Sequence, residues 1–257
     1  MARIITVTNK KGGCGKTTTA VNLAAAIAIH GKRVLVIDLD PQAHATYYLR
    51  VDNKHFNEHL AGMFSGSFSI SRLIEKTDIP NLFIVPASDE LYDLDEKLPK
   101  TDKTLTILSD RLSSIKDDFN YIIIDTPAHI GMTSLNAMIA ATELLIPLQV
   151  QFLSFMALRE LVKILLDVVE PNNPNIKATW ILPTMFDGRE KAGLAIIEEA
   201  KAIFKDKVLK TFIRKSIKLA EAPRHRKPVI LYEPYSPGAA DYYNLAKELI
   251  AKEKDFQ

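Results

Sequence analysis

A glycine-rich run near the amino terminus has the composition of a loop that binds nucleotide phosphates. It occupies residues 11–18 and is followed at once by a segment with helical spacing. Glycines let backbone N–H groups turn toward an anion, and a helix amino terminus directs the positive end of its dipole at that anion. Lys16 stands where a lysine reaches the β- and γ-phosphates, and Thr17 where a hydroxyl binds Mg²⁺. The predicted contacts are Lys11, Gly12, Gly13, Cys14, Gly15, Lys16, Thr17 and Thr18.

Three aspartates end two later strand-like runs. Asp38 and Asp40 follow the run at 34–37, and Asp125 follows the run at 121–124. In an open α/β sheet, ligands bind at the carboxyl ends of the strands. Asp125 has the position of the Mg²⁺-associated carboxylate of such nucleotide hydrolases. Strand-end aspartates also cap helices, so a structural role for Asp38 and Asp40 stays open.

Short apolar runs alternate with longer segments of helical spacing along the whole chain. Continuous apolar runs are typical of strands buried on both faces of a sheet. We therefore predict a single α/β domain over residues 1–257, with a mostly parallel twisted sheet and helices on both faces. The segment at 50–71 has no clear period, and its role stays open. Predicted strands are Ile4–Thr8, Val34–Ile37, Leu82–Val85, Tyr121–Ile124, Leu144–Leu148, Thr179–Leu182 and Val229–Tyr232; predicted helices are Thr17–Ile29, Thr104–Ile115, Phe155–Val169, Leu194–Phe204 and Ala239–Lys252.

Composition favours a soluble cytoplasmic protein. Hydrophobic residues make up 47% and charged residues 25% of the 257 residues, which excludes global disorder. We see no apolar run long enough to span a bilayer and no signal-peptide pattern. The single cysteine, Cys14, excludes an intramolecular disulfide.

The net charge of +2 hides a basic block at residues 201–227. Ten Lys or Arg residues stand there against two acids, Asp206 and Glu221. Such a block indicates either a solvated face or a surface for polyanions.

Taken together, these motifs resemble the ParA/Soj partition ATPases, which belong with MinD to the P-loop ATPases that have a deviant Walker A motif. Lys11 stands where the ordinary phosphate-loop pattern has glycine, and this second lysine marks the deviant form. The resemblance covers most of the chain. Its strongest segments are Ile5–Asn22, Arg33–Gln42, Tyr121–Pro127, Leu219–Pro223, Lys227–Pro228 and Gly238–Glu248.

The resemblance implies an ATPase whose subunits form a homodimer around two ATP molecules and Mg²⁺. Lys11 would reach the partner's phosphates, and Lys16 would hold the phosphates of its own subunit. Asp40 would orient the attacking water with Asp38 in support, while Thr17 and Asp125 would act on Mg²⁺. Met185 and Arg214 would bind the nucleotide, Arg214 near the adenine, although the family often has proline in place of Arg214.

For partners, the resemblance implies non-specific DNA and a ParB-like adaptor that stimulates hydrolysis, with the protein on the nucleoid. Dimerisation would double the number of phosphate contacts and so let ATP switch DNA binding on. The phosphate loop begins by residue 10, which leaves no room before it for a helix-turn-helix domain. The positions matching the family's DNA contacts are Arg189 and Lys218, with Lys210, Lys215 and Arg224 as neighbours.

Alternative functions remain for a chain of this kind. A relative that positions a protein cargo on the nucleoid has the same motifs, because an adaptor sets the cargo. A MinD-like membrane-surface ATPase needs a carboxy-terminal amphipathic helix, and the end of this chain is too short and mixed in charge for one. One cysteine is too few to ligate the cluster of an iron–sulfur reductase. An amidoligase would need an extra substrate-binding domain, and the sequence shows none.

Three further residues near the predicted site depart from the family's pattern. Cys14 replaces the more usual valine; we expect a packed side chain, with a reactive thiol of lowered pKa as the alternative. For His44 and His129 we expect hydrogen bonds within their loops rather than metal binding.

Overall fold

The computed structural model describes residues 2–51, 59–99 and 101–253. The strands it contains form a single seven-stranded sheet in the order β3-β4-β2-β5-β1-β6-β7. Neighbouring strands are parallel except for the edge pair β3 and β4, which is antiparallel. The predicted fold class, an α/β fold with a mostly parallel sheet, is confirmed. Its strands are β1 Arg3–Val7, β2 Val34–Asp38, β3 Glu75–Lys76, β4 Leu82–Val85, β5 Tyr121–Asp125, β6 Glu143–Gln149 and β7 Ala178–Thr184.

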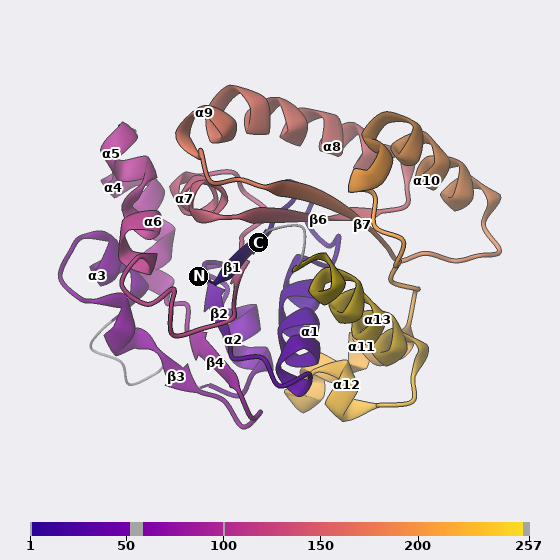
Figure 1. The fold of residues 1–257 in the computed structure, drawn as a ribbon, viewed down its shortest axis with the longest axis horizontal. Coiled ribbons are helices and arrows are strands. Elements are labelled where there is room, and N and C mark those ends of the chain that lie inside the picture. Colours follow the sequence, from indigo (N-terminus) through magenta and orange to yellow (C-terminus); the bar gives the residue numbers. More distant parts are fainter. Residues whose placement is uncertain (1, 52–58, 100, 254–257) are drawn as a thin grey trace.

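Helices cover both faces of this sheet (Figure 1). Successive side chains of a strand point to opposite faces, so Ile5 packs in the cluster with α1 and α13 while Ile4 packs in the cluster on the other face. Helices α8 and α10 lie on that other face, over β6 and β7. The α-helices are α1 Lys16–Ile29, α2 His44–Tyr48, α3 Leu60–Phe64, α4 Leu94–Lys97, α5 Asp102–Leu105, α6 Ile107–Leu112, α7 Met132–Ala140, α8 Phe152–Ile164, α9 Glu170–Asn172, α10 Lys191–Phe204, α11 Ile217–Glu221, α12 Val229–Tyr232 and α13 Pro237–Ala251.

The strand register brings the predicted chemistry to one edge of the sheet. Val7 and Asp38 both pair with Asp125, because β1 and β2 flank β5 in parallel. The phosphate loop after β1 and the aspartates that end β2 and β5 are therefore neighbours at the carboxyl edge.

The prediction of a strand at Val229–Tyr232 is wrong. These residues form helix α12, and the N–H of Val229 donates to Asn22 Oδ1 of α1 at 2.7 Å. A four-residue apolar run has no periodicity that separates a buried strand from a buried helix, so the neighbouring elements decide.

Smaller differences concern segment boundaries. The predicted helix Thr104–Ile115 is divided at Thr106 into α5 and α6, and the short edge strand β3 was not predicted. Of the undecided stretch 50–71, residues 52–58 lie outside the described part, while α3 and a 3₁₀ helix at Ile70–Leu73 form the rest of its regular structure.

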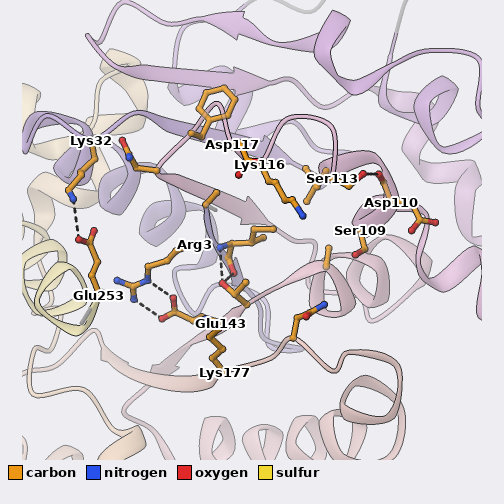
Figure 2. Close-up of a pocket in the computed structure, with 18 residues that line it drawn as sticks. Arg3, Lys32, Ser109, Asp110, Ser113, Lys116, Asp117, Glu143, Lys177 and Glu253 are labelled. Carbon is orange, nitrogen blue, oxygen red and sulfur yellow. Dashed lines mark hydrogen bonds and ion pairs between the residues drawn. The ribbon is translucent and has the colours of Figure 1, made fainter. Parts of the chain in front are cut away.

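A buried ion pair fixes the amino edge of the sheet, opposite the phosphate loop. Arg3 donates to both carboxylate oxygens of Glu143 at 2.6 and 2.7 Å, and Trp180 Nε1 donates to Glu143 Oε2 at 2.7 Å. Arg3 also donates to the carbonyl oxygen of Leu249 at 2.5 Å, which ties α13 to the sheet. A cavity of about 860 Å³ opens at this edge and is lined by Arg3, Glu143 and Lys116 among others (Figure 2). Because the sequence-predicted residues stand at the opposite edge, this cavity is not the candidate site.

Replacing Arg3 with methionine should lower the free energy of unfolding by about 3–5 kcal/mol, because it leaves the Glu143 carboxylate buried without its cation. Urea unfolding measures the effect. Lys97→Met is the control, since it removes an exposed ion pair with Asp93 and should cost less than about 1 kcal/mol. Equal losses in the two variants would contradict a stabilising role for the buried pair.

No helix in the described ranges is long and apolar enough to cross a membrane.

Candidate nucleotide-binding site

The phosphate loop is held open by backbone geometry and by one buried asparagine. Gly13 and Gly15 have φ values of 72° and 94°, a conformation that side chains disfavour. Asn9 Nδ2 donates to the carbonyl oxygen of Pro147 at 2.8 Å, and Asn9 Oδ1 accepts from the N–H of Lys11 at 3.0 Å. Asn9 therefore fixes the start of the loop to β6, a role that the motif did not predict.

The two loop lysines point in different directions. Lys16 is only 7% exposed and its Nζ donates back across the loop to the carbonyl oxygen of Lys11 at 3.3 Å. Lys11 Nζ instead donates to Ser154 Oγ at 2.7 Å and lies 3.4 Å from Gln151 Oε1, at the start of α8. Lys16 is thus aimed over its own loop, whereas Lys11 is directed at the start of α8, where its two hydrogen-bond partners are neutral groups.

Asp125 is a buried carboxylate at the end of β5, with Thr17 and Lys16 close enough to oppose the rise of its pKa. Neither Oδ atom has a partner among the described residues, and both are shielded from solvent. Burial raises the pKa of Asp125 well above its usual range, and the negative charge of Asp38 raises it further. An unpaired buried carboxylate is costly unless a cation neutralises it. Its position beside Thr17 and Lys16 fits a divalent cation bound with the phosphates.

Asp38 is occupied by contacts within the protein. Its Oδ2 accepts from the N–H and the hydroxyl of Thr46 at 2.8 and 2.7 Å, and its Oδ1 accepts from the N–H of Asp40 at 3.2 Å. Burial raises the pKa of Asp38 to about 6, although these hydrogen bonds oppose the rise. Asp38 therefore fixes the loop that follows β2 and the helix α2 beyond it.

Asp40 lies in that loop and is partly exposed. Its Oδ1 accepts from the N–H of Gln42 at 3.0 Å, which holds the carboxylate in a tight turn. The sequence makes Asp38 and Asp40 look alike, but the structure separates a buried, fully engaged carboxylate from one that is open to the site.

The buried acids predict a specific pH dependence. Because the pKa of Asp125 is raised in the folded state above its value of 3.8 elsewhere, its contribution to stability is full below that value and is lost as pH rises through the folded pKa. Asp125→Asn should therefore stabilise the protein without nucleotide or Mg²⁺ at pH 8, by up to about 1.4 kcal/mol for each pKa unit of the shift. The gain should shrink toward pH 4. Thermal unfolding across this range measures it, and a variant no more stable than the wild type at pH 8 would contradict the account.

The alternative of a reactive Cys14 is contradicted. Cys14 is fully buried, and burial raises the pKa of its thiol despite the nearby Lys16. The Thr184 hydroxyl donates to its carbonyl oxygen at 2.9 Å, which leaves Cys14 as a packed residue between the loop and β7.

The residues predicted to bind the nucleotide outside the phosphate loop lie on two paired segments. Met185 has a positive φ of 54° and is partly exposed, and the next residue, Phe186, pairs with Arg214. The Arg214 guanidinium donates to the Asp241 carboxylate, with a shortest distance of 2.7 Å. Arg214 is therefore engaged by α13, while Met185 is exposed.

The predicted DNA contacts are all exposed or partly exposed. Arg189 and Lys215 both lie near Asp187. The Asp187 carboxylate accepts a hydrogen bond from Arg189 at 2.6 Å, and the charge of Lys215 helps to lower its pKa. Lys218 donates to Glu221 at 2.9 Å. Lys210 and Arg224 are exposed on segments before and after these.

His44 and His129 are both exposed near the carboxyl edge. His129 accepts a hydrogen bond at its carbonyl oxygen from the Ser134 hydroxyl at 2.6 Å. No group of three or more metal-ligating side chains occurs in the described residues. Sequence reasoning missed Asn9, Thr46 and Ser154, because neither local spacing nor a motif links them to the residues they contact.

Comparisons with known proteins agree with this geometry. The family described as "AAA domain" matches residues 2–178. The chain is 38% identical to the sporulation initiation inhibitor protein Soj of Bacillus subtilis, over 98% of this chain and 99% of that protein. It is 35% identical to the chromosome partitioning protein ParA of Myxococcus xanthus, over 98% of this chain and 89% of that protein.

A solved structure of similar fold is cobyrinic acid a,c-diamide synthase from Mycobacterium smegmatis with bound ADP and magnesium. It has a TM-score of 0.86 and 27% identity, and the match covers 100% of this chain and 97% of that one.

Proposed function

Since this chain belongs to the ParA/Soj family of partition ATPases, we propose that it is an ATP-driven DNA-partition switch. It is a P-loop ATPase that uses ATP and Mg²⁺. The observation that supports the nucleotide site most directly is the orphaned Asp125 carboxylate beside the phosphate loop. The relative named for chromosome partitioning, ParA of Myxococcus xanthus at 35% identity, favours this function over that of a MinD-like membrane-surface ATPase.

In hydrolysis, the residues of this chain bind, orient and neutralise. Backbone N–H groups of the loop and Lys16 would hold the phosphates, and Thr17 and Asp125 would hold Mg²⁺, whose charge would neutralise that of the phosphoryl group. Asp40 orients the attacking water. Asp38 is a positioning residue, because both of its oxygens are engaged with Asp40 and Thr46.

Dimerisation would complete the site. The direction of Lys11 away from its own loop supports a role in trans, since moving from the neutral Ser154 and Gln151 to phosphate oxygens would pair its charge with an anion. Two apolar side chains of α8, the helix that Lys11 contacts, are exposed to solvent: Leu153 is 73% and Met156 45% exposed. An apolar surface beside a cation meant for a partner fits an interface between two copies of the chain.

DNA is the polyanion proposed for the basic block and for Arg189. We propose that the dimer binds DNA without sequence preference, that a ParB-like adaptor stimulates hydrolysis and so releases it, and that the protein acts in the cytoplasm on the nucleoid. The exposed cations Arg189, Lys210, Lys215 and Arg224 support this.

Substituting the cations tests the DNA role. Arg189→Ala and Lys218→Ala should each weaken ATP-dependent binding to a random-sequence duplex, and the salt slope should fall by about 0.9 for each DNA phosphate that the variant no longer neutralises. Lys97→Ala, an exposed lysine on α4, is the control and should bind like the wild type. Unchanged affinity in both test variants would place the DNA surface elsewhere.

A further inference from the structure

Helix α2 contacts both the loop that contains Asp40 and the end of the basic block. On one side, Asp38 accepts hydrogen bonds from Thr46, which fixes α2 to the end of β2. On the other side, Arg226 Nε donates to the carbonyl oxygen of Tyr47 at 3.0 Å, and its guanidinium carbon lies 5.0 Å from the centroid of the Tyr47 ring. Two adjacent residues of α2 thus make the two contacts. Thr46 contacts Asp38, which precedes the loop that contains Asp40, and Tyr47 contacts Arg226 of the basic block.

The backbone at Arg226 has an unusual conformation. Arg226 has φ 49° and ψ 46°, a left-handed conformation that favours glycine, directly after the 3₁₀ helix Ala222–His225. Its N–H donates to the carbonyl oxygen of Pro223 at 3.0 Å, which joins Arg226 to the turn that carries Arg224.

A second, buried connection anchors the other end of the same segment. Asn22 of α1 donates to the carbonyl oxygen of Thr18 at 2.7 Å and accepts from the N–H of Val229 at 2.7 Å. The phosphate-loop helix therefore holds the residues that follow the basic block. The Tyr47–Arg226 contact, which lies between this anchor and α2, is by contrast exposed.

We propose that Tyr47 and Arg226 are positioning residues that couple the nucleotide state at Asp40 to the DNA affinity of the basic block. This inference rests on the proposed function. The γ-phosphate and the attacking water set the arrangement of the Asp40 loop, the Asp38–Thr46 hydrogen bonds carry that arrangement into α2, and Tyr47 passes it to Arg226. Such coupling is reciprocal, so DNA must tighten nucleotide binding by the same factor.

Two substitutions weaken the contact without removing charge. Tyr47→Leu removes the ring from an exposed position, and Arg226→Lys keeps the cation but loses the planar guanidinium that stacks and donates through Nε. Tyr92→Leu, at another exposed tyrosine in the 3₁₀ helix Asp89–Asp93, is the matched control.

The measurement is the ratio of the DNA dissociation constants with ADP and with a non-hydrolysable ATP analogue, over a salt series. We expect this ratio to fall by about fivefold or more in Tyr47→Leu and Arg226→Lys, with an unchanged salt slope, while Tyr92→Leu matches the wild type. A wild-type ratio in both test variants would overturn the inference, as would a loss seen only in Arg226→Lys with a shallower salt slope. If the wild type binds no DNA in any nucleotide state, the proposed function itself fails, and this inference fails with it.

Discussion

Asp40→Ala should lower the rate of ATP hydrolysis by at least about 100-fold while ATP affinity stays within a few-fold of the wild type. Groups that orient or activate an attacking nucleophile contribute about 10²–10⁴ to rate. The Asp40 carboxylate accepts a hydrogen bond from the N–H of Gln42, and the loop keeps its hydrogen bonds from Thr46 to Asp38 when that carboxylate is removed. The fold and the phosphate loop therefore survive the change, and the ATP-bound dimer should accumulate on DNA.

Single-turnover phosphate release measures this effect, and Asp40→Asn is the control for geometry. The asparagine keeps an oxygen for the Gln42 N–H but lacks the negative charge, so it should be nearly as slow as alanine if the charge matters. Hydrolysis by Asp40→Ala at the wild-type rate would show that another group orients the water.

Lys16→Ala should weaken ATP binding by at least about 100-fold. The Lys16 ammonium is nearly buried over the loop, where contacts with phosphate are poorly screened by solvent. Removing one partner of a buried charge pair costs about 3–5 kcal/mol, and each 1.4 kcal/mol is a factor of ten in affinity.

Titration with a fluorescent ATP analogue measures the loss. Lys10→Ala is the matched control, because Lys10 is the preceding lysine of the same run but forms an exposed ion pair with Glu160. Lys10→Ala should bind within about twofold of the wild type, since exposed pairs contribute about 1 kcal/mol or less. Similar affinities in the two variants would contradict the assignment of Lys16.

The sheet and the phosphate loop could be predicted because their signals are local. Continuous apolar runs marked β1, β2 and β5, and glycines at positions that require positive φ marked the loop. The helix α12 could not be predicted, since the hydrogen bond from Val229 to Asn22 that favours it joins residues 207 positions apart. Local pattern describes what a segment can form, and tertiary contacts choose among the possibilities.

The roles of the site residues could likewise be predicted only in part from the sequence. Asp38 and Asp40 are equivalent as strand-end aspartates, and only burial and hydrogen bonding to Thr46 distinguish them. The contact between Lys11 and Ser154 spans 143 residues and has no sequence signal. The alternative of a low thiol pKa for Cys14 failed because burial outweighs the favourable charges around the loop.

The most direct test of the central claim is the binding of the wild-type chain to a random-sequence DNA duplex without nucleotide, with ADP and with a non-hydrolysable ATP analogue, across a salt series. We expect binding with the ATP analogue that weakens steeply as salt rises, and at least about tenfold weaker binding in the other two states, because the proposed ATP-bound dimer would present two basic surfaces. Equal affinity in all three states, or no binding in any of them, would contradict an ATP-controlled DNA switch.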